Sequence, residues 1–104
     1  MQWDPNDVVD DKVVESSEWW IDLKEYEKLE PRAGVYLFAN ASYDIKYIGT
    51  AGAGKMVEVI RKAIKNKKSK GATKVRALYT NSTERAKSLQ KTLIGKYDPV
   101  NNRK

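Results

Sequence analysis

Residues 34–49 read GVYLFANASYDIKYIG, two apolar runs separated by a polar turn. The first run extends from Ala33 to Ala39 and the second from Ile45 to Ile48, and both are rich in aromatic and branched side chains. Such residues favour strands when turn-forming residues stand between them. The stretch therefore predicts a β-hairpin in which Tyr36 and Tyr47 stand on neighbouring strands.

The hairpin is followed by patterns that alternate between helix and strand. Apolar residues recur at helical spacing from Lys55 to about Asn66, and they alternate with polar residues from Lys74 to Tyr79. Asn81 and Glu84 have the spacing of a capping box, so a second helix is expected from there to about Lys96. The order predicts an α+β domain with a small three-stranded antiparallel sheet flanked by helices.

The sequence before the hairpin is acidic and weakly patterned. Leucine and tyrosine recur every three residues from Leu23 to Leu29, which predicts a short helix that Pro31 ends. We expect residues 1–30 to form an acidic arm with this helix, and residues 31–104 to form the main domain. Trp19 and Trp20 are interpreted as core or interface residues.

Composition limits the possible chemistry. The 104 residues include no cysteine and no histidine, which excludes disulfides, thiolate metal sites and the commonest general base. Catalysis would have to use tyrosine, lysine, arginine, carboxylates or a hard cation. The sequence shows neither a signal peptide nor an apolar run of membrane-spanning length, so we expect a cytoplasmic protein with no membrane partner.

Charge is divided unevenly along the chain. Residues 1–54 hold 5 basic and 11 acidic side chains, whereas residues 55–104 hold 15 basic and 3 acidic ones. A half this basic attracts polyanions, and counterion release makes such binding sensitive to salt. The alternative is a surface whose acidic half neutralises the basic one. The predicted nucleic-acid contacts are Lys55, Lys65, Lys67, Lys68, Lys70, Lys74 and Arg76.

Three short motifs occur in a recognisable order. Gly34-Val35-Tyr36 is followed by Tyr47-Ile48-Gly49, and then by a leucine-rich helix that leads through Tyr97 and Pro99 to Asn102. In this order and spacing, residues 31–102 resemble the GIY-YIG nuclease family.

The resemblance implies an endonuclease that hydrolyses phosphodiester bonds of DNA, including branched or nicked DNA, with Mg²⁺ or Mn²⁺. Tyr36 or Tyr47 would position or deprotonate the attacking water, although a phenol is a weak base unless its pKa is lowered. Arg61 would stabilise charge on the phosphate, the residue at position 90 would hold the metal, and Asn102 would brace the site.

Two positions depart from the family pattern. Gln90 stands where the family carries its metal-binding glutamate, so a dication would be held weakly. Val59 occupies the position expected for the helical arginine, and Arg61 lies two residues beyond it.

The function consequently has three interpretations. The first is an endonuclease scaffold that is inactive or impaired because Gln90 replaces glutamate. The second is a naturally inactive domain that binds nucleic acid without cutting it, and the third is a protein-interaction module. Whether Gln90 is natural or an installed replacement stays open at this point.

Overall fold

The computed structural model describes residues 2–17 and 19–103. The main strands are β3 (Gly34–Ala39), β4 (Ile45–Ala51) and β5 (Lys74–Tyr79). The two α-helices are α1 (Met56–Lys65) and α2 (Thr83–Tyr97). Shorter elements complete the fold, namely η1 (Pro5–Val9), β1 (Glu15–Ser16), β2 (Ile21–Asp22), η2 (Leu23–Lys28) and η3 (Val100–Asn102).

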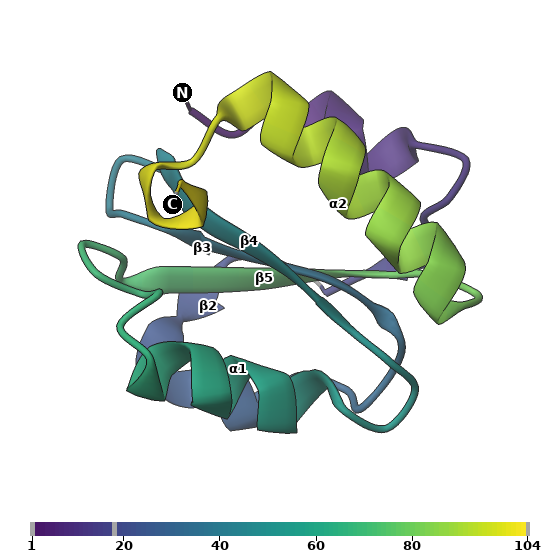
Figure 1. Ribbon diagram of the computed structural model, residues 1–104, viewed down its shortest axis with the longest axis horizontal. Coiled ribbons are helices and arrows are strands. Elements are labelled where there is room, and N and C mark those ends of the chain that lie inside the picture. Colours follow the sequence, from purple (N-terminus) through teal and green to yellow (C-terminus); the bar gives the residue numbers. More distant parts are fainter. Residues whose placement is uncertain (1, 18, 104) are drawn as a thin grey trace.

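The sheet is antiparallel throughout, with β3 and β5 at its centre and β4 at one edge. The register places Tyr36 opposite Gly49 and Phe38 opposite Tyr47, so the predicted hairpin is confirmed. Helix α1 covers one face of the sheet and α2 covers the other (Figure 1). The predicted α+β class is therefore confirmed.

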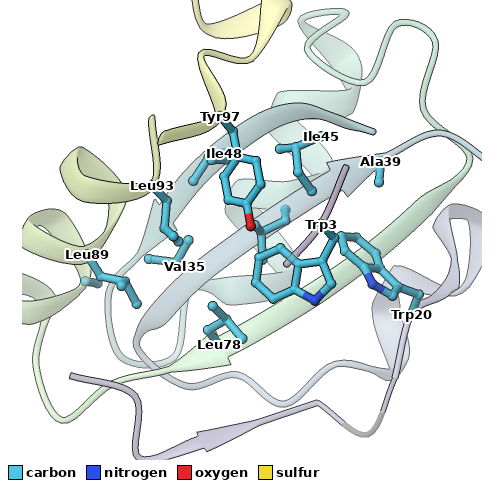
Figure 2. Packing of buried hydrophobic residues seen from close by; sticks show 12 residues of the cluster. Trp3, Trp20, Val35, Ala39, Ile45, Ile48, Leu78, Leu89, Leu93 and Tyr97 are labelled. Carbon is cyan, nitrogen blue, oxygen red and sulfur yellow. The ribbon is translucent and has the colours of Figure 1, made fainter. Parts of the chain in front are cut away.

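Each face of the sheet has its own core. On the α2 side, Leu89 and Leu93 pack on Val35, Ile48 and other strand residues (Figure 2). The α1 side holds a second cluster, which consists of Leu29, Tyr36, Phe38, Ala51, Met56, Ile60, Ala63, Val75, Ala77 and Tyr79. Alternation along the strands sends Tyr36 to the α1 side and its neighbours to the α2 side.

The N-terminal segment is part of this globule. Trp3 and Trp20 are buried in the α2-side core, where the Trp3 ring stacks on Tyr97 with centroids 5.8 Å apart (Figure 2). The two-residue strands β1 and β2 both pair with β5. The sheet thus has five strands where the sequence predicted three, and residues before the hairpin contribute to its core.

Two further predictions need correction in detail. Ser82, not Asn81, caps α2, because its side chain accepts a hydrogen bond from the Arg85 amide. The segment Leu23–Lys28 is a 3₁₀-helix, and the backbone φ and ψ angles at Glu25 within it are not helical.

No helix within residues 2–17 and 19–103 is both long and apolar enough to cross a membrane.

Candidate functional site

Tyr36 and Tyr47 face each other on the α1 side of the sheet. Their ring centroids are 6.1 Å apart, with Tyr36 buried and Tyr47 half-buried. The Tyr36 ring lies across Gly49, and a Cβ at that position would overlap it. Glycine at position 49 therefore leaves the space that the hydroxyl end of the Tyr36 ring occupies.

Gln90 and Asn102 meet at the backbone of Ile48, which lies between Tyr47 and Gly49. Asn102 accepts a hydrogen bond from the Ile48 amide at 2.8 Å and donates one to the Ile48 carbonyl at 2.9 Å. Gln90 Nε2 donates to the same carbonyl at 3.0 Å. We call Tyr36, Tyr47, Gln90 and Asn102 the tyrosine site, because each is one of residues 47–49 or contacts one of them. The two tyrosines lie on the α1 side of the sheet, whereas Gln90 extends from α2 on the other side.

The bond made by Gln90 fixes the orientation of its amide. A carbonyl oxygen only accepts hydrogen bonds, so the group that faces Ile48 has to be the nitrogen. A glutamate at position 90 would set an anionic oxygen against that carbonyl instead. Glutamine is therefore the side chain that suits this contact.

The residues of the tyrosine site do not fit a divalent cation. A hard dication needs anionic oxygen ligands, and this site contains two phenols and two carboxamides whose nitrogens face Ile48. Across residues 2–17 and 19–103, no three histidine, cysteine, aspartate or glutamate side chains are grouped so that they could hold a metal.

Burial also disfavours ionisation of the first tyrosine. Desolvation, and next the adjacent Tyr47 phenol, raise the pKa of Tyr36 well above its ordinary value. A phenol in this state keeps its proton at neutral pH. Tyr36 is thus unsuited to deprotonate a water molecule.

Arg61 lies away from the tyrosine site. Its Nε donates to the Tyr26 hydroxyl at 3.1 Å, and its guanidinium forms an ion pair with Glu27 at 3.7 Å. The structure directs this arginine toward η2, whereas the half-buried Val59 packs against the α1-side core. The contacts of Arg61 connect helix α1 to η2 and do not involve Tyr36 or Tyr47.

The predicted lysines are concentrated around the loop between α1 and β5. The lysine surface, as we name it, comprises exposed and half-buried side chains of this region: Lys65, Lys67, Lys68, Lys70 and Lys74. Within the described ranges, none of them forms an ion pair with an acidic side chain. Their charge is therefore available to a partner outside the chain.

This loop is held in place beside the tyrosine site. Asn101 Nδ2 donates to the carbonyls of Lys68 and Lys70, at 2.8 and 2.9 Å. The Lys68 ammonium lies 5.9 Å from the centroid of the Tyr47 ring. The C-terminal turn thus makes two contacts: Asn101 holds the backbone of the lysine loop, and Asn102 holds the backbone of Ile48.

Lys55 and Arg76 lie apart from the lysine surface. Lys55 precedes α1, at the opposite end of the helix from Lys65, and pairs with Glu58 at 3.4 Å. Arg76 is 5% exposed, with its guanidinium 5.1 Å from the centroid of the Trp19 ring. Its burial lowers its pKa, and its side chain lies on the α2 side of β5.

Sequence reasoning missed Asn101 and Tyr26 as functional candidates. Asn101 precedes the motif asparagine, and neighbouring asparagines after a Pro-containing turn are a signal that could have identified it. Nothing local links Tyr26 to Arg61, because 35 residues separate them.

No protein-family model matches the chain, and comparison with curated proteins gives no significant match.

Proposed function

We propose that this chain is a GIY-YIG-like domain that binds DNA through phosphate contacts and does not cut it by the metal-dependent reaction of that family. The observation that carries the binding proposal is the lysine surface, whose five cations have no acidic partner within residues 2–17 and 19–103. Phosphate contacts of this kind position a protein on DNA without reading its sequence.

Gln90 supports the absence of cleavage. Its amide is occupied as a donor to Ile48, and it provides no negative charge for a dication. The raised pKa of Tyr36 and the engagement of Arg61 with Tyr26 remove two further groups that the reaction would need. Gln90 and Arg61 each have a hydrogen-bond partner within the fold, and Tyr36 is buried in its core. These contacts favour Gln90 as a natural residue of the domain over an installed replacement.

An impaired endonuclease is the second candidate. It is supported by the proximity of Tyr36 to Tyr47 and by the meeting of Gln90 and Asn102 at Ile48, next to Tyr47 in the chain. In that case the binding of Mg²⁺ or Mn²⁺ would return once Gln90 became glutamate.

The binding proposal is tested by fluorescence anisotropy with labelled duplex DNA of unrelated sequences. If about six phosphates are engaged, affinity should fall by roughly 10³ between about 50 and 200 mM salt, with little difference among sequences. An affinity that does not change with salt concentration, or a strong preference for one sequence, would refute the proposal.

Cleavage of supercoiled plasmid with Mg²⁺ or Mn²⁺ separates the two candidates. We expect no cutting by the chain or by Gln90→Glu, because Val59 leaves the arginine position empty. Gln90→Glu combined with Val59→Arg is the smallest change that we expect to restore cutting. Cutting by Gln90→Glu alone, abolished by adding Tyr47→Phe, would establish the impaired endonuclease instead.

A further inference from the structure

An open pocket lies between η2, the end of α1 and the loop before β5. Its volume is about 400 Å³, and Leu23, Tyr26, Ile64 and Ala72 provide apolar walls. These four side chains pack on the α1-side core. The pocket is thus a mainly apolar hollow that does not include the tyrosine site.

Residues that line the pocket are sequence neighbours of the lysine surface. Ile64 is followed directly by Lys65, and Ala72 and Thr73 lie between Lys70 and Lys74. Lys24 adds a cation to the lining, balanced by Asp22. A ligand with an apolar planar part and an adjacent negative charge would complement both regions.

One wall of this pocket is an aromatic ring that is held in position. The Tyr26 hydroxyl accepts the 3.1 Å hydrogen bond from Arg61, whose guanidinium carbon is 6.0 Å from the ring centroid. Proteins that bind single-stranded nucleic acid stack bases on aromatic rings, and nearby arginines add cation–π attraction. Tyr26 is therefore the wall of the pocket best suited to stack a base.

We infer that this pocket accepts an unpaired nucleobase of the bound DNA, stacked on Tyr26, while the flanking phosphates contact Lys65 and Lys67. The inference rests on the proposed DNA binding and specifies its ligand. A base inside a duplex has both faces covered by its neighbours, so only an unpaired base can enter. DNA with an unpaired nucleotide should consequently be preferred over a continuous duplex.

The test compares three labelled DNAs of one sequence: a continuous duplex, a duplex with one unpaired central nucleotide, and the same bulge with that nucleotide abasic. Stacking of one base should make the bulged DNA bind about 5- to 150-fold more tightly than the abasic one. Equal affinity for the bulged and abasic DNAs would overturn the inference.

Variants locate the effect in the pocket. Tyr26→Leu removes the ring and should eliminate the preference for the base, whereas Tyr26→Phe keeps the ring and should retain the preference. Ala72→Leu fills the pocket from another wall and should act like Tyr26→Leu. A preference that survives both Tyr26→Leu and Ala72→Leu in folded protein would place the base elsewhere and refute the assignment.

The outcome for DNA binding itself is separate. If Lys67→Glu with Lys68→Glu leaves the affinity for all three DNAs unchanged, the proposed function fails together with this inference. If those reversals weaken all three while the abasic DNA binds as well as the bulged one, DNA binding stands and only the base pocket fails.

Discussion

The N-terminal segment and the loop between α1 and β5 carry opposite charges, and the fold uses these charges differently. Each acidic side chain described in residues 2–17 has a cationic partner: Asp4 and Asp7 with Lys96, Asp10 and Asp11 with Lys12, and Glu15 with Arg32. The lysine surface has no such partner within the described ranges. Three of these carboxylates, Asp4, Asp7 and Glu15, pair with cations outside the segment and help to attach it, whereas the lysine surface carries charge that no described acidic side chain balances.

The largest expected effect concerns the attachment of the N-terminal segment. Trp3 is 9% exposed and packs on both Trp20 and Tyr97, so Trp3→Ala should lower the free energy of unfolding by roughly 3–5 kcal/mol. Urea unfolding measures this loss. Trp19→Ala is the matched control, because Trp19 is 53% exposed, and an equal loss there would contradict the comparison.

Charge reversal in the loop should affect binding without affecting stability. Lys68→Glu with Lys70→Glu should reduce affinity for DNA by roughly 100-fold at about 0.1 M salt, about tenfold for each phosphate that is no longer neutralised. The unfolding free energy should change by less than about 0.5 kcal/mol per site. Lys87→Glu with Lys91→Glu on the exposed side of α2 is the control. If the control pair weakened binding as much, the loop would not be the binding surface.

A smaller effect is expected at the hydroxyl that joins the N-terminal segment to α2. Tyr97 donates to Asp7 and accepts from the Asp4 amide at 2.9 Å, so Tyr97→Phe leaves that amide without its acceptor. We expect a loss of about 1–2 kcal/mol in unfolding free energy. Tyr26→Phe, whose hydroxyl bonds the exposed Arg61, should cost less in the same assay.

The smallest expected effect is a loss of stability in alkali. Burial raises the pKa of Tyr97, and the hydrogen bond to Asp7 raises it further. The folded protein then binds more protons than the unfolded chain above the ordinary tyrosine value of 10.0, so stability is complete below that pH and falls as pH rises beyond it. Melting temperatures between about pH 8 and 11 should show this decline, with a shallower slope in Tyr97→Phe. A melting temperature that rises across this interval would show that the sign is wrong.

The main elements could be predicted because each carries a local pattern. Alternation defined β5 from Lys74 to Tyr79, and helical spacing of Met56 and Ile60 defined α1. Strands β1 and β2 are two residues long, too short for any periodicity, and they exist because β5 offers them an edge. The burial of Trp3 could not be predicted from local sequence either, because the residues that it packs against lie far along the chain.

The candidate site could be predicted only in part for a related reason. Motif order identified Tyr36, Tyr47 and Asn102, and the structure brings them together around residues 47–49. The sequence showed that Gln90 lacks the charge of glutamate, yet it could not show which acceptor the amide would find. That acceptor, the Ile48 carbonyl, lies 42 residues away, and its position depends on how α2 packs on the sheet.

The hydrogen bonds at Ile48 also bear on how these molecules behave when concentrated. Strand β4 is the outermost strand of its side of the sheet, and such a strand can recruit a strand from another molecule and start aggregation. Asn102 occupies both the amide and the carbonyl of Ile48, and Gln90 adds a second donor to the carbonyl. Two carboxamides thereby block the middle of β4, so an incoming strand would find its central pairing position already taken.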